Sequence, residues 1–327
     1  MFTPSVLRDG GLFVYLERGV RMITNPMDVR EAYPIRRSYK QKSAFIVAVT
    51  AYLQSLRYSV TVENGKQKSR NLVIGDPETA RYLITAHYDT PATSLFPNLL
   101  LPTNRFAYFA YQTIVILGYM LIASLLCLPF SLVTQDVTAL FVIWYIFYMA
   151  MVFMMRFGPA NRNNANDNTS GVVTLLEIAR SIPQNQRNQV CFVLFDQEEK
   201  GLVGSGSYVK AHKEAVQNQI VFNLDCVGDG DVLLLEPEKK VREDDDLQRL
   251  LRSIEGDIGC KQIRVAKGKC NGSSDHKKFP LGVGVKAVHR MKGIGYYCGR
   301  IHTNRDTRLD QTNVNILRAA LISLITK

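Results

Sequence analysis

An apolar segment that ends on two polar side chains, YLITAHYD, occupies residues 82–89. Its β-branched and aromatic residues favour a buried strand that delivers His87 and Asp89 at its end. Similar apolar runs lead to the pair Glu198 and Glu199 and to Asp225. Sites in open α/β sheets form at the carboxyl ends of the strands. We therefore expect these side chains to meet at one edge of a sheet.

The segments on either side alternate between helix-like and strand-like patterns. Apolar residues recur at helical spacing over residues 36–57 and 171–179, whereas residues 189–195 and 219–224 are continuous apolar runs. Such runs are typical of strands buried on both faces. The alternation predicts an α/β fold with a mixed sheet, parallel in its centre and flanked by helices.

Two uncharged stretches interrupt this pattern. Residues 106–135 and 137–155 contain no Asp, Glu, Lys or Arg, and each is long enough to cross a bilayer. A buried helical hairpin or a dimerisation arm of a soluble protein is the alternative. We expect a transmembrane hairpin in contact with lipid over residues 106–155. The predicted division is an N-terminal segment (1–34), a main domain (35–104 and 157–327) and an inserted hairpin (105–156).

Charges beside the insert predict its orientation. Arg105, Arg156 and Arg162 flank its outer ends, and the connecting loop has no Lys or Arg. Positive flanks mark the cytoplasmic side of a membrane. We therefore expect an integral protein of the cell membrane whose main domain lies in the cytoplasm. Residues 1–21 are broken by charges, which predicts no secretory signal.

The net charge of +11 suits attraction to anionic lipid headgroups. No nucleic-acid reader motif accompanies it, so nucleic acid is not an expected partner. The densest basic cluster, Arg36 to Lys42, is interpreted as a solvated helix face. The six cysteines show no paired spacing and predict no disulfide framework.

The polar residues at the strand ends have the ligand chemistry of a two-metal hydrolytic site. His87 and Asp89 are two apart on extended chain, so their side chains leave on the same side and the carboxylate can orient the imidazole. Glu198 and Glu199 are adjacent and point apart. One can hold a metal ion while the other faces the attacking water.

Several of these residues have simpler explanations when they are taken singly. Asp167 lies in a polar turn that opens a helix, where capping is the ordinary role. The acidic pair can form an exposed turn, and Asp196 is interpreted as a turn residue. Asp225 and His302 are weak signals alone. A carboxylate shared by two cations ~3.5–4 Å apart accounts for Asp167 once the set is considered together.

As an ordered set, six segments resemble peptidase family M28, the aminopeptidases with co-catalytic zinc. The resemblance extends from about residue 40 to the end of the chain, apart from the insert. The matching segments are AHYDT (86–90), NDNTSG (166–171), EEKGLVGS (198–205), NLD (223–225), SSDHKKF (273–279) and IHTNRDT (301–307).

This resemblance implies two divalent metal ions, expected to be Zn²⁺. His87 and Asp225 would hold one ion, Glu199 and His302 the other, and Asp167 would bridge them. The resemblance also makes Glu198 the general base and Asp89 the partner of His87. Asn166 stands where the family commonly has an acidic residue. Asp275 and Asp306 match family positions and are assigned to the pocket wall and to the surroundings of the ligands.

The implied function is a membrane-anchored, metal-dependent aminopeptidase that hydrolyses peptides, with Glu198 transferring the proton of a water activated by the two ions. Ligands limited to nitrogen and oxygen suit Zn²⁺ but also Mn²⁺ or Co²⁺. Two alternatives stay open. One is another hydrolase, or a glutaminyl-cyclase-like acyltransferase, of the same fold. The other is a catalytically inactive membrane scaffold, which would have no physical reason to keep six costly polar groups together.

Overall fold

The computed structural model describes residues 20–326. A ten-stranded sheet has the order β1-β2-β4-β3-β5-β9-β6-β8-β7, and β10 pairs with β9. The central strands β4, β3, β5 and β9 are parallel, which confirms the predicted mixed sheet. The expected absence of a secretory signal concerns residues that lie almost wholly outside the described ones. The strands are β1 (Val60–Asn64), β2 (Arg70–Ile74), β3 (Tyr82–His87), β4 (Val190–Phe195), β5 (Ile220–Leu224), β6 (Val232–Pro237), β7 (Gly256–Ile258), β8 (Lys261–Val265), β9 (Gly282–Met291) and β10 (Gly295–Tyr297).

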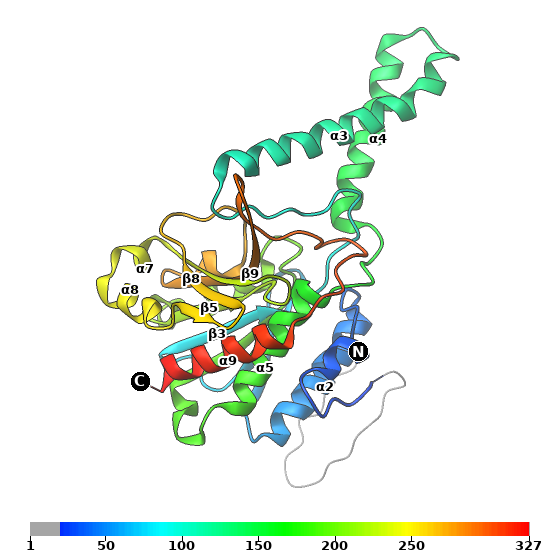
Figure 1. Cartoon of the computed structure of the whole chain (residues 1–327). Coiled ribbons are helices and arrows are strands. Elements are labelled where there is room, and N and C mark those ends of the chain that lie inside the picture. Colours follow the sequence, from blue (N-terminus) through cyan, green and yellow to red (C-terminus); the bar gives the residue numbers. More distant parts are fainter. Residues whose placement is uncertain (1–19, 327) are drawn as a thin grey trace.

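Helices cover both faces of the sheet (Figure 1). Side chains of β3 alternate between two cores: Ile84 joins a cluster with α2, α5 and α9, whereas Leu83 joins one with Tyr208 of α6. Every residue of β3, β4 and β5 is buried, as expected for strands covered on both sides. The helices are α1 (Asp28–Ala32), α2 (Tyr39–Ser55), α3 (Arg105–Ser131), α4 (Val137–Phe157), α5 (Gly171–Ser181), α6 (Val203–Ala211), α7 (Lys239–Glu243), α8 (Asp245–Arg252) and α9 (Gln311–Ile325).

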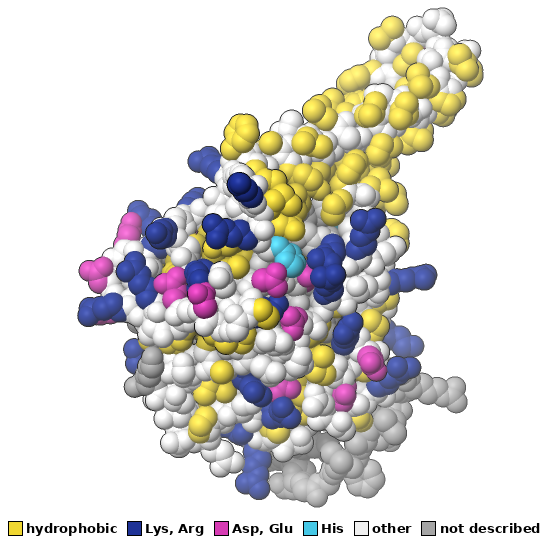
Figure 2. Space-filling model, viewed as in Figure 1, with side chains coloured by type: hydrophobic (Ala, Val, Ile, Leu, Met, Phe, Trp, Pro, Cys, Tyr) yellow, Lys and Arg dark blue, Asp and Glu magenta, His cyan; other side chains and the backbone are white. Residues whose placement is uncertain are grey.

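The insert forms two antiparallel helices, α3 and α4, which project from the domain (Figure 1). By length and composition both can cross a membrane. The 27 residues of α3 extend ~40 Å, against ~30 Å for the hydrocarbon core of a bilayer. The helices meet through Tyr119 and Met151, while outward side chains such as Leu121 and Ile146 are 61% and 58% exposed. Figure 2 shows this apolar surface, which needs lipid or a protein partner to cover it.

One sequence-based interpretation of charged residues is wrong and another is incomplete. The basic cluster is not a solvated face throughout, because Arg36 is fully buried and Lys42 is 5% exposed. Asp196 lies in the bend after β4, as predicted, but it is fully buried and its carboxylate accepts a 2.7 Å bond from Lys42. Its second oxygen accepts from the backbone N–H of Arg70. Lys42 therefore neutralises a charge one residue beyond β4.

Replacing Lys42 by Met should lower the free energy of unfolding by about 3–5 kcal/mol, because it leaves Asp196 buried and unpaired. Lys40 lies on the same helix but is exposed. Its replacement by Met is the matched control and should change stability by less than about 0.5 kcal/mol. Chemical unfolding of both variants in detergent measures the difference. Equal stabilities would show that the Lys42–Asp196 pair contributes nothing.

Candidate metal centre

Five segments bring their polar residues to the carboxyl edge of the central strands. His87 is the last residue of β3, and Asp225 follows β5 directly. The pair Glu198 and Glu199 follows β4 by three residues. Asp167 comes from the short helical segment η2 (Ala165–Ser170) before α5, and His302 from the loop between β10 and α9.

Asp167 lies between two histidines. Its Oδ1 is 3.3 Å from Nε2 of His87, and its Oδ2 is 3.1 Å from Nε2 of His302. Asp225 Oδ1 is 3.8 Å from the same nitrogen of His87, and Glu199 Oε2 is 3.5 Å from that of His302. One carboxylate thus presents a different oxygen to each of two groups of ligating atoms, and each group lies within 4.8 Å.

Asp89 holds the glutamate pair as well as facing His87. Its Oδ1 accepts from the backbone N–H of Glu198 at 3.0 Å, and its Oδ2 accepts from that of Glu199 at 3.3 Å. Asp89 Oδ1 also lies 3.6 Å from Nδ1 of His87. Asp89 therefore fixes the histidine and the acidic pair together, a role that spacing alone did not indicate.

Asp225 is restrained from behind by two donors. Ser274 Oγ donates to its Oδ2 at 2.6 Å, and the buried Lys286 donates to the same oxygen at 2.8 Å. Only Oδ1 is left to face His87. Although burial opposes it, Lys286 and His87 hold the pKa of this carboxyl well below its usual range. Lys286 was not among the predicted site residues, although a lysine inside the apolar run of β9 was a visible signal.

The Asp167 segment is held by a residue that sequence analysis placed in solvent. Arg36 donates to the carbonyl of Tyr88, between His87 and Asp89, and to the hydroxyl of Thr169 at 3.1 Å. This guanidinium therefore ties the end of β3 to the segment that carries Asp167.

Two further polar residues fix the same segment from other sides. Asp306 accepts from the backbone N–H groups of Asn166 and Asp167 at 2.7 and 3.0 Å. Asn168 donates to the carbonyl of Leu224, the last residue of β5, at 2.9 Å. The segment is thus bonded to the His302 loop and to the strand that leads to Asp225.

The backbone at the ligands is strained. Gln197, Cys226 and His302 have φ values of 57°, 61° and 60°, a region that residues with side chains rarely adopt. Each is a proposed ligand or the neighbour of Glu198 or Asp225. Strain of this kind persists where the surroundings over-determine it and gathers at functional sites.

The His302 loop is also bonded to the segment that precedes the insert. The backbone N–H of Ser94 donates to the carbonyl of His302 at 2.9 Å, and that of Asn98 donates to Ile301 at 3.3 Å. Between them, the ring of Phe96 packs against Tyr119 of α3 with centroids 5.1 Å apart. The packing of the helical hairpin and the position of His302 are therefore mechanically linked.

The centre holds more buried negative charge than the chain itself neutralises. Burial, with neighbouring carboxylates adding to it, raises the pKa of Glu198 and of Glu199 well above their ordinary values. Burial likewise raises the pKa of Asp275 to about 7. Crowded carboxylates of this kind favour protons or bound cations.

The residues present fit divalent cations. The donors are imidazole nitrogens and carboxylate oxygens, and three overlapping groups of them lie close enough to hold an ion. Glu199 Oε1 and both oxygens of Asp275 are buried without a hydrogen-bond partner within residues 20–326. Cations between the carboxylates would reduce their mutual repulsion and would give Glu199 Oε1 the partner that it lacks.

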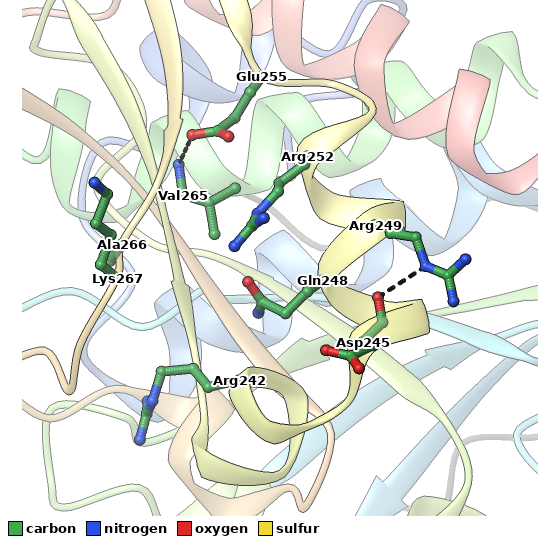
Figure 3. Close-up of a pocket in the computed structure, with 9 residues that line it drawn as sticks. All are labelled: Arg242, Asp245, Gln248, Arg249, Arg252, Glu255, Val265, Ala266 and Lys267. Carbon is green, nitrogen blue, oxygen red and sulfur yellow. Dashed lines mark hydrogen bonds between the residues drawn. The ribbon is translucent and has the colours of Figure 1, made fainter.

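One large surface cleft lies away from this centre. A surface cleft of about 880 Å³ lies between α8 and β8 and is lined mainly by charged side chains (Figure 3). None of the residues at the candidate metal centre lines it. The convergence of ligating atoms is therefore a better guide to the metal centre than a surface cleft is.

A family comparison agrees with this geometry. The model of peptidase family M28 matches residues 152–323, more than half of the chain. The chain belongs to peptidase family M28. The match contains Asp167, the glutamate pair, Asp225 and His302, while His87 and Asp89 lie before it.

Two curated relatives of this M28 chain match it over short segments. A probable glutamate carboxypeptidase of Arabidopsis thaliana is 29% identical over 151 residues, 40% of this chain and 22% of that protein. An aminopeptidase of Bacillus subtilis is 44% identical over 69 residues, 20% of this chain and 15% of that protein. The matches span less than a quarter of either relative.

Solved structures show the same fold. A Zn-dependent exopeptidase from Parabacteroides distasonis has a TM-score of 0.56 at 16% identity, covering 94% of this chain and 99% of that one. A glutaminyl cyclase from Porphyromonas gingivalis also scores 0.56, at 18% identity, covering 92% and 94%. The fold is thus similar to both kinds of enzyme and does not separate their activities.

Replacing Asp306 by Ala should weaken divalent-metal binding about tenfold or more, because the backbone of Asn166 and Asp167 loses both of its acceptors. Asp306→Asn keeps one acceptor oxygen and should give an intermediate value. Dialysis against buffered metal followed by elemental analysis measures the affinities, and circular dichroism checks the fold. Wild-type affinity in a folded Asp306→Ala protein would contradict this role.

Proposed function

We propose that this member of the M28 family is an aminopeptidase that uses two divalent metal ions, in the first instance Zn²⁺. The observation that carries the proposal is the position of Asp167, with one carboxylate oxygen toward His87 and Asp225 and the other toward Glu199 and His302. A single-metal centre would need only one of these groups. The family and the zinc-dependent neighbour support the choice of zinc.

In this mechanism, His87 and Asp225 would hold one ion and Glu199 and His302 the other, and the carboxylate of Asp167 would contribute to both sites. When bound, such ions acidify water and stabilise the negative charge that develops on the scissile carbonyl oxygen. Glu198 removes the proton of the attacking water and passes it to the departing amine. Asp89 holds Glu198 and Glu199 through their backbone N–H groups, so the base and one ligand keep a fixed separation.

The charge of the centre favours substrates that present an amine. The two buried basic side chains of the centre are already hydrogen-bonded, Arg36 to Tyr88 and Thr169, and Lys286 to Asp225. Asp275 is a buried carboxylate without a hydrogen-bond partner in the part of the chain that is described. Asp275 is not among the proposed metal ligands, so its carboxylate attracts an α-ammonium group and repels a terminal carboxylate. This supports an aminopeptidase over a carboxypeptidase.

Glutaminyl cyclisation is the second candidate, because a glutaminyl cyclase shares the fold at the same TM-score as the exopeptidase. That reaction also begins from a free N-terminal amine, but it releases ammonia and leaves the peptide bond intact. Release of the first residue therefore separates the two activities.

The purified protein should cleave the first residue from peptides with a free α-amine and leave N-acetylated peptides intact. Glu198→Gln should lower turnover by at least about 100-fold, because the general base is lost, while metal content stays near that of the wild type. Chromatography of the products and elemental analysis measure the two quantities. Equal cleavage of acetylated peptides would exclude the aminopeptidase, and loss of metal together with activity would show that Glu198 is not the base.

We also propose that α3 and α4 span the cell membrane and that the peptidase domain lies on the cytoplasmic side. The exposed apolar surfaces of both helices support the first statement. The second is supported by Arg105 and Arg156 at the domain ends of the helices and by the absence of Lys and Arg from the connection 132–136. A dimerisation arm would present the same apolar surface and is the competing explanation.

The protein should stay in the membrane pellet after washing with alkaline carbonate, because apolar helices of this length are not extracted without detergent. Protease added to intact cells should leave the domain uncut. Immunoblotting of the pellet, the supernatant and the treated cells gives both results. Clean release into the supernatant would exclude membrane spanning, whereas digestion in intact cells would reverse only the orientation.

A further inference from the structure

We propose that a second surface of the domain contacts anionic phospholipid headgroups beside the point where α3 begins. This basal surface consists of residues 103–105 and of residues 290–295, the turn between β9 and β10 with its flanks. The inference rests on the proposed membrane anchoring and goes beyond it, because it assigns a lipid contact to the peptidase domain itself.

The β9–β10 turn is fixed next to the helical hairpin. Asn104, the N-terminal cap of α3, donates from Nδ2 to the carbonyl of Ile294 at 3.0 Å. Figure 1 shows the turn reaching the beginning of α3. The apolar outer surface of the helix starts at once, with Phe106 85% exposed. If α3 enters the bilayer here, the basal surface lies at the depth of the headgroups.

The composition of the basal surface suits an interface of apolar chains and phosphate. Residues 290–294 are consecutively exposed, and Met291 and Ile294 are 43% and 37% exposed. Arg290 and Lys292 flank Met291, and Arg105 lines the same shallow cleft of about 480 Å³. Apolar side chains surrounded by Lys and Arg are typical of segments that insert into the boundary of an anionic membrane.

The three cations of the basal surface have no carboxylate partner. In residues 20–326, no ion pair joins Arg105, Arg290 or Lys292 to Asp or Glu, and no acidic residue lines the cleft. The guanidinium of Arg105 lies over the ring of Phe109, on the helix that it begins, at 5.5 Å from the ring centroid. Their charge is therefore available to lipid phosphate.

The cleft of Figure 3 provides a contrast. It also contains arginines, but Asp245 and Glu255 line it together with them. Arg249 is bonded there to the carbonyl of Asp245, and also to the carboxylate of Asp246. Arginines in a cleft are thus not sufficient to indicate a lipid contact. The basal surface differs because no acidic residue lines its cleft and because it continues the apolar surface of α3.

Environment-sensitive fluorescence of the full-length protein in lipid nanodiscs tests the proposal. A single accessible cysteine is introduced at Met291, Leu121 or Asn185 after the exposed Cys260 and the half-buried Cys127 are replaced by Ser, which leaves only buried cysteines among the native ones. Leu121 reports the middle of α3, and Asn185 is an exposed residue in the segment between α5 and β4. Each is labelled with the nitrobenzoxadiazole fluorophore and compared in phosphatidylcholine and in its mixture with phosphatidylglycerol.

The label at Met291 should emit at shorter wavelength in the mixed discs than in phosphatidylcholine alone, and spin-labelled headgroups should quench it. Arg290→Gln with Lys292→Gln should abolish that difference. The emission of the label at Leu121 should shift to shorter wavelength in both lipids, and that of the label at Asn185 in neither.

If the label at Leu121 shifts while the emission at Met291 stays as in water, the headgroup contact is overturned and the anchor is left intact. If the emission of the label at Leu121 stays as in water, the anchor itself is overturned. A shift at Met291 that persists in detergent and grows with protein concentration would assign the surface to a second copy and also overturn the proposal.

Discussion

Asp167 presents one carboxylate oxygen to each of two histidines, His87 and His302, that lie far apart in the sequence. Buried contacts from several parts of the fold hold it in this position. Asp306 accepts from its backbone, while Arg36 and Asn168 tie the surrounding segment to the ends of β3 and β5. Each contact satisfies a buried polar group that would otherwise be costly. The same contacts that stabilise this irregular segment therefore set the geometry of the centre.

The insert is joined to the peptidase domain at a sensitive place. Phe96 packs into the helical hairpin between two residues whose backbones bond to the His302 loop. An anchor attached through a flexible linker would leave the centre indifferent to the membrane. Here the position of a proposed ligand depends on how α3 and α4 pack, so the packing of the proposed anchor and the position of His302 share one set of contacts.

The sequence predicted the central sheet well because apolar runs such as 189–195 and 219–224 report burial directly. It also singled out the polar residues at strand ends, since the parallel topology places those ends at one edge. It did not predict the short elements α1, α7, β7 and β10, whose few residues carry little periodicity. It misjudged Arg36 and Lys42, because a charge that is buried against a partner more than a hundred residues away looks in sequence like any solvated charge.

The central claim is that six side chains surround a pair of cations: His87, Asp167, Glu198, Glu199, Asp225 and His302. Anomalous diffraction at the zinc absorption edge tests it most directly. Crystals of the detergent-purified protein should show two peaks, ~3.5–4 Å apart, on the two sides of the Asp167 carboxylate. One peak should lie beside His87 and Asp225 and the other beside Glu199 and His302. A single peak, or peaks that Asp167 does not join, would contradict the two-metal account.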